Sequence, residues 1–204
     1  MIQNIVTSII LYSGTAVDLL IILMLFFAKR KSRKDIINIY LGQFLGSVSL
    51  IFLSLLFAFV LNYIPSKEIL GLLGLIPIFL GLKVLLLGDS DGEAIAKDGL
   101  RKDNKNLVLL VAMITFASCG ADNIGVFVPY FITLNLANLI VVLLTFLVMI
   151  YLLAFSAQKL AQVPSVGETL EKYSRWFIAV VYLGLGMYIL IENNSFDMLR
   201  TVFG

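Results

Sequence analysis

The chain has 204 residues, of which 60% are hydrophobic and 14% charged, and its formal net charge is +2. Its mean hydropathy of +1.02 excludes an ordinary water-soluble domain and indicates a protein of the lipid bilayer. A single cysteine excludes an intrachain disulfide. The absence of histidine removes the commonest metal ligand and the usual proton carrier at neutral pH.

Six apolar segments are each long enough to cross a hydrocarbon core of about 30 Å as a helix. They are expected near residues 4–28, 36–62, 68–87, 107–132, 136–158 and 174–192. A polar stretch at 88–106 separates residues 1–87 from residues 107–204, with three segments in each half. The sequence therefore predicts an all-α membrane protein with six transmembrane helices.

The lysines and arginines set the expected orientation, because basic loops stay in the cytoplasm. Alternate connections carry five, four and three of these residues, twelve of the fifteen in the chain. The opposite side carries only Lys67 and Arg200. Residues 88–106 are therefore expected to be a cytoplasmic loop and both termini extracellular. The same bias accounts for the net positive charge, so no nucleic-acid partner is expected.

An odd number of helices in each half makes the second half begin on the opposite side of the membrane. Similar halves would then form an inverted repeat. A shift of 104 residues places Asp18 on Asp122 and Thr15 on Cys119. We therefore expect two inverted three-helix repeats that bring the two acids to matching places.

Asp18 in LYSGTAVDLLIIL and Asp122 in FASCGADNIGVFV lie near the middle of apolar segments. An acid at the bilayer centre costs roughly 2.5 kcal/mol or more, so it should face a protein interior or a water-filled path. The alternative is a buried acid hydrogen-bonded for structure alone. Gly120, Gly125 and Pro129 further predict an irregular fourth helix that could free backbone carbonyls beside a site.

Cys119, Asp122 and Asn123 have the spacing i, i+3 and i+4, which places them on one face of a helix. Thr15 and Asp18 share a face of the first helix in the same way. A thiolate among oxygen ligands suits cadmium or zinc better than magnesium or calcium. For Cys119 alone, a small packing residue is an equally good interpretation.

Gln43 and Lys83 are two further polar residues in apolar segments. Gln43, between Gly42 and Gly46, either packs against a neighbouring helix or lines the path. Lys83 lies close enough to the cytoplasmic end of its helix to reach the interface, and the alternative is a countercharge for an empty aspartate site.

The runs ASCGADNIGVFVPYF and YSGTAVDLLIIL resemble the cadmium resistance transporters of the CadD type, which belong to the lysine-exporter (LysE) superfamily. The resemblance spans essentially the whole chain, and SCGADN is its most specific part. It implies a multi-pass protein of the bacterial cell membrane that exports Cd²⁺, with Zn²⁺ as a secondary substrate. It points to Cys119, Gly120, Asp122 and Asn123, with Asp18 as the partner acid. Apart from the resemblance, Thr15, Ser118, Gln43 and Lys83 are expected as supporting residues.

Export of a divalent cation against an inside-negative potential of 100 mV costs roughly 4.6 kcal/mol. The sequence contains no GxxxxGK[ST] loop, so direct ATP coupling is not expected. Exchange for two protons carried by Asp18 and Asp122 would supply this work without net charge movement.

Two other classes of protein are compatible with six helices and two buried acids. An exporter of an organic cation or amino acid would use the aspartates as countercharges. A membrane thiol-disulfide enzyme is disfavoured because dithiol exchange needs a second cysteine, and no enzymatic activity is expected. The expected partners are the metal ion and membrane lipid, and the sequence leaves open whether the chain forms a homodimer.

Overall fold

The computed structural model describes residues 2–29, 32–61, 71–87 and 106–193. Its helices are α1 (Ile2–Thr15), α2 (Val17–Lys29), α3 (Arg33–Leu61), α5 (Leu75–Leu87), α7 (Leu107–Ile132), α8 (Leu136–Leu160) and α9 (Pro164–Glu192), with the 3₁₀ turn η1 (Leu72–Gly74). The described residues contain no β-strand, so the all-α class is confirmed for this part of the chain. All but one residue of the predicted loop at 88–106 lies outside the described residues.

Three helices, α3, α7 and α8, are individually long and apolar enough to cross a membrane. A fourth candidate span is the pair α1 and α2, which is bent by 59°. Two shorter apolar helices, Leu72–Leu86 and Arg175–Ile191, coincide with the third and sixth predicted segments. The structure therefore supports a membrane protein with three or four candidate spans, and six spans remain a prediction.

The break in the helical pattern lies in the first segment, at Ala16. Two local features weaken the helix there. Gly14 lowers helical stability, and the Thr15 hydroxyl donates to the Tyr12 carbonyl at 3.2 Å, a bond that bends helices. The prediction of an irregular fourth helix is wrong, because α7 continues through Gly120, Gly125 and Pro129. Pro129 removes only one backbone donor close to the end of that helix.

Helix pairs approach closely where glycines replace side chains. The most extensive contact joins α3 to α7, where a Cβ on Gly42 would lie 2.6 Å from the Val108 carbonyl oxygen. A Cβ on Gly46 would lie 2.7 Å from the Thr115 Cβ. The next most extensive contact joins α5 to α9, where Gly186 lies against Ile78, and Gly74 of η1 meets the same glycine. Small residues of this kind allow close packing between helices in membranes.

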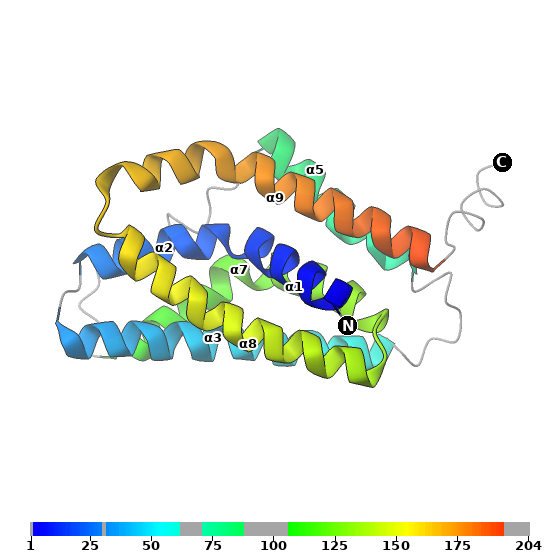
Figure 1. Ribbon diagram of the computed structural model, residues 1–204, viewed down its shortest axis with the longest axis horizontal. Helices are drawn as coiled ribbons and strands as arrows, with labels where there is room; N and C mark the ends of the chain where they lie inside the picture. Colours follow the sequence, from blue (N-terminus) through cyan, green and yellow to red (C-terminus); the bar gives the residue numbers. More distant parts are fainter. Residues whose placement is uncertain (1, 30–31, 62–70, 88–105, 194–204) are drawn as a thin grey trace.

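The helices run between the same two ends of the bundle. In Figure 1, α1 begins and α9 finishes on the right of the bundle. On the left, α2 and α8 finish, and α3 and α9 begin. The second end carries Lys29, Arg33, Lys34 and Lys159. We refer to it as the basic end.

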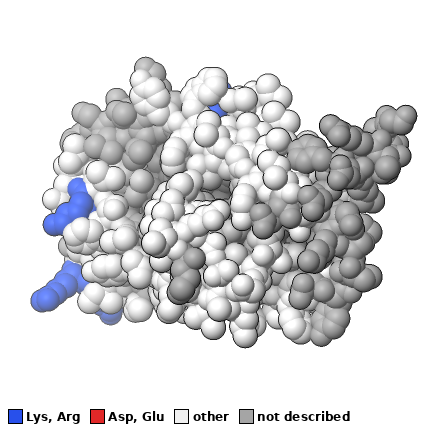
Figure 2. Space-filling view, turned by 45° about the vertical axis from the view of Figure 1, so that its right-hand side comes forward, with Lys and Arg blue, Asp and Glu red and all other residues white. Residues whose placement is uncertain are grey.

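The outer surface of the bundle is apolar over much of its length. Large side chains such as Phe52, Phe59, Phe79 and Leu86 are more than half exposed. Figure 2 shows Lys and Arg gathered mainly at one end of the face it draws, with a further basic group at the upper edge and otherwise uncharged described residues between. Such a band is expected of helices that face lipid.

Candidate cation site

Asp18 lies in the first turn of α2, directly after the break, and is half-buried. The first backbone N–H groups of a helix have no partner within the helix, and its dipole favours negative charge at this end. The break therefore gives the Asp18 carboxylate a favourable position inside an apolar helix. The sequence identified this acid but did not predict that a helix begins there.

Five polar or thiol side chains share one face of α7. Spacings of three and four residues, the repeat of a helical face, relate Thr115 to Ser118 and Cys119, and Cys119 to Asp122 and Asn123. Cys119 is 3% exposed, Thr115 1% and Asn123 7%, while Ser118 and Asp122 are half-buried. The structure thus confirms that Cys119, Asp122 and Asn123 lie on one continuous helix and on one face of it.

Three oxygens of this face are buried without a hydrogen-bond partner. They are Thr115 Oγ1, Ser118 Oγ and Asn123 Oδ1. Leaving such a group unpaired costs about 1–3 kcal/mol, so native proteins usually satisfy it with protein, water or an ion. These oxygens are acceptors with free lone pairs, as a cation site requires.

Two further helices bring polar groups to the same region. On α3, Gln43 is 1% exposed and Ser47 4%, and Gln43 Nε2 donates to Ser47 Oγ at 3.4 Å. The Tyr12 hydroxyl of α1 hydrogen-bonds with the Ser47 side chain and interacts electrostatically with Cys119. Side-chain interactions therefore connect α1, α3 and α7 in the bundle interior, through Tyr12, Ser47 and Cys119.

The described residues contain no group of three or more Cys, Asp or Glu side chains placed to hold one metal ion. In this arrangement Asp18, Cys119 and Asp122 therefore do not converge on a single point. A complete coordination shell built here would also need neutral oxygens, and α7 offers those of Thr115, Ser118 and Asn123.

The remaining residues around the predicted site differ in their surroundings. Thr15 is buried and its hydroxyl is bonded to Tyr12. Gly120 faces Leu50 of α3, with room for a Cβ at 3.6 Å. Lys83 is exposed on α5. Sequence reasoning passed over Thr115, Ser47 and Tyr12, although Thr115 precedes Cys119 by one helical turn and Ser47 follows Gln43 by one.

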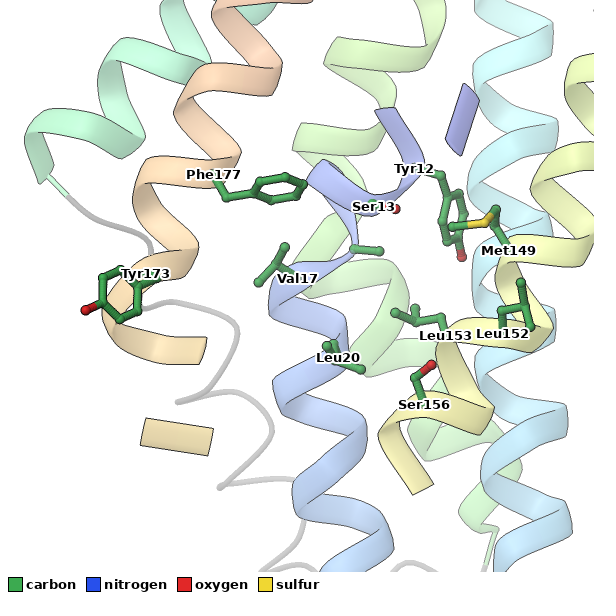
Figure 3. Close-up of a pocket in the computed structure, with 11 residues that line it drawn as sticks. Tyr12, Ser13, Val17, Leu20, Met149, Leu152, Leu153, Ser156, Tyr173 and Phe177 are labelled. Atoms are coloured by element: carbon green, nitrogen blue, oxygen red, sulfur yellow. The ribbon is translucent and has the colours of Figure 1, made fainter. Parts of the chain in front are cut away.

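A cavity of about 400 Å³ lies beside the break, between α1, α2, α8 and α9. Figure 3 shows Phe177 of α9 pointing towards the break and Tyr12 standing between α1 and Met149 of α8. Among the side chains that the structure describes, no charged one lines the cavity, and none of the predicted metal ligands does. The candidate cation site is therefore a buried polar region between helices rather than this cavity.

Comparison with protein families matches residues 12–202 to the family described as cadmium resistance transporter. A search of curated proteins and a search of solved structures each returned no match. The matched region includes both intramembrane aspartates, Cys119 and every helix from α2 to α9. Because the match covers well over half of the chain, the protein belongs to the cadmium resistance transporter family.

Proposed function

We propose that the chain is a secondary transporter of the bacterial cell membrane that exports Cd²⁺, and secondarily Zn²⁺, in exchange for protons. The carrying observation is the buried Cys119 thiol on the same face of α7 as two buried, unpartnered oxygens, Thr115 Oγ1 and Asn123 Oδ1. A thiolate selects soft or borderline cations, and oxygen donors complete the shell. We assign Cys119, Asp122 and Asn123 as the α7 ligands and Asp18 as the partner acid.

We also propose that the two halves form an inverted repeat. The support lies in which helices pair. Exchange of the halves maps α1 and α2 onto α7, α3 onto α8, and α5 onto α9. The counterpart of the contact between α3 and α7 is then the contact of α8 with α1 and α2, and this contact is also extensive. The contact between α5 and α9 is its own counterpart, because the exchange only swaps these two helices. The same exchange relates Asp18 to Asp122.

The break between α1 and α2 supports a transport role for Asp18. Discontinuous helices at the interface of two repeats commonly hold the substrates of secondary transporters, because their ends present free backbone groups. We propose that each of the two carboxyls carries a proton when no cation is bound, because a metal ligand must lose its proton to bind the ion. In the proposed cycle, Cd²⁺ from the cytoplasm displaces protons from Asp18 and Asp122, and protons from outside later displace the metal.

Asp122→Asn tests the role of this acid as ligand and proton carrier. The amide keeps the size of the side chain but cannot lose a proton, so we expect cells carrying the variant to lose most cadmium tolerance. Asp35→Asn is the matched control, because Asp35 is a half-buried acid in the first turn of α3, at the basic end of the bundle. Full tolerance with Asp122→Asn, at equal protein in the membrane, would contradict the assignment.

The cavity beside the break favours a second candidate substrate, an organic cation. Tyr12, Tyr173 and Phe177 line this cavity, and aromatic faces attract quaternary ammonium groups. Thermal unfolding of the purified protein with Cd²⁺, Zn²⁺, Mn²⁺ or choline separates the two candidates. Stabilisation by Cd²⁺ and none by choline is expected, whereas the reverse result would replace metal export by organic-cation export.

A further inference from the structure

Thr115 is a buried threonine on the same face of α7 as Cys119, and it has been assigned no role of its own so far. Its side chain is 1% exposed, and Oγ1 has no hydrogen-bond partner. A threonine inside a helix commonly donates to the carbonyl one turn earlier. Thr145 in α8 does so, with a bond of 2.8 Å to the Val141 carbonyl. Thr115 therefore keeps a free hydroxyl in a position where its own helix could satisfy it.

Helix α3 packs against α7 at Thr115. Gly46 lies directly against Thr115, so that a Cβ there would be 2.7 Å from the Thr115 Cβ. Gly46 is flanked in α3 by Gln43 and Ser47, which are both buried and bonded to each other. The free oxygen thus belongs to the polar interior between α3 and α7, not to the lipid-facing surface.

Thr115 and Ser118 also lie on the approach to Cys119. α7 ends four residues before α8 begins, at the end of the bundle opposite to the basic end, so α7 begins at the basic end. At 1.5 Å rise per residue, Thr115 lies about 6 Å nearer to the basic end than Cys119. Ser118 Oγ, also unpartnered, comes between the two.

We propose that Thr115 and Ser118 form a hydroxyl subsite on the basic-end side of the Cys119 ligands, where their oxygens contact the bound divalent cation. This inference rests on the proposed function, cation transport. Neutral hydroxyl oxygens replace part of the hydration shell of the ion without holding it as tightly as a carboxylate or a thiolate would. A site of this strength lets an ion enter and leave, which conduction along a path requires.

Thr115→Val tests this subsite, because valine keeps the shape of threonine and removes only the oxygen. We expect the metal-free variant to unfold at the same or a higher temperature than the wild type, since an unpaired buried hydroxyl is lost. We expect its Kd for Cd²⁺ in calorimetry of the purified full chain to rise about tenfold, as for the loss of one direct interaction. Thr115→Ser keeps the oxygen and should bind Cd²⁺ nearly as the wild type does.

Thr145→Val is the matched control. Its hydroxyl is already bonded, so this variant should unfold at a slightly lower temperature and keep its Kd for Cd²⁺. An unchanged Kd in Thr115→Val, with Cys119→Ser impaired, would overturn the subsite and leave the proposed function intact. A wild type that binds neither Cd²⁺ nor Zn²⁺ would overturn both. A lower unfolding temperature of metal-free Thr115→Val would assign the hydroxyl a structural role and overturn the subsite.

Discussion

Cys119 differs in chemical character from every other proposed ligand. Its sulfur is polarisable, whereas Asp18, Asp122 and Asn123 offer hard oxygens. The thiol lies in a buried cluster with Leu19, Leu23 and Leu50 of the neighbouring helices. Burial in apolar surroundings limits access to water, so a cation that reaches the thiol must exchange hydration for protein ligands. Selectivity for a soft metal is therefore expected to depend on this one side chain.

Cys119→Ser replaces the soft donor by a hard one of similar size. We expect the Kd for Cd²⁺, measured by calorimetry, to rise at least about tenfold, or 1.4 kcal/mol, while that for Mn²⁺ changes little. The Mn²⁺ measurement is the internal control for folding. Equal losses for both metals would instead show that Cys119 acts through packing.

Single residues could be predicted from the sequence where their type is unusual for its place. Asp18, Asp122 and Cys119 are conspicuous in apolar helices, and helical spacing put Asn123 beside them. Thr115, Ser47 and Tyr12 are ordinary residues of membrane helices, so no pattern distinguished them. Only the burial of Thr115 Oγ1 without a partner and the contact of Tyr12 with Ser47 identify them.

At the scale of elements, the contact between α3 and α7 positions the candidate site. Gly42 and Gly46 are spaced by four residues and let α7 approach within van der Waals distance of the α3 backbone. This approach holds the face that carries Thr115 and Cys119 against the interior. The glycine pair therefore acts on the site through helix position rather than through chemistry.

Gly46→Ala tests this contact. A Cβ at this position would lie 2.7 Å from the Thr115 Cβ and 2.9 Å from the Ala112 carbonyl oxygen, which requires the helices to separate. We expect a loss of about 1–3 kcal/mol in the free energy of unfolding, seen as a lower unfolding temperature, and weaker Cd²⁺ binding. Gly184→Ala in α9 is the control, because its added Cβ would meet no atom within 4 Å beyond the backbone of its own helix, and it should not destabilise the protein. Equal unfolding temperatures and equal Cd²⁺ binding of the two variants would show that α3 and α7 are not tightly packed at Gly46.

The elements themselves followed from hydropathy with good accuracy. The predicted segments 107–132 and 136–158 coincide with α7 and α8 to within a few residues. The break was predicted in the wrong helix because glycine and proline counts pointed to the fourth segment. In the structure, the back-bonded Thr15 and the packing of Gly14 against Val181 accompany a break in the first segment instead. Tertiary contacts of this kind are not visible in a single sequence.

At the scale of the whole molecule, the chain offers few charged groups for coupling. The sequence has no histidine, Lys83 is exposed, and two carboxyls of the described residues, Asp18 and Asp122, lie within apolar stretches of the helices. If each carries one proton when the metal is absent, one Cd²⁺ exchanges for two protons and no net charge crosses the membrane. The membrane potential would then neither oppose nor drive export.

This stoichiometry makes separate predictions for the pH gradient and the membrane potential. In proteoliposomes with a lumen one pH unit more acidic than the medium, two protons per ion support accumulation of Cd²⁺ up to about 100-fold. A potassium diffusion potential should leave the wild-type uptake rate unchanged.

Asp18→Asn removes one proton carrier, so each transport cycle of this variant should move one net charge across the membrane. Its uptake should therefore become sensitive to the potential, at about 2.3 kcal/mol per 100 mV. Asp35→Asn should behave as the wild type. Uptake that ignores the pH gradient would exclude proton exchange, whereas wild-type uptake that follows the potential would exclude only the two-proton ratio.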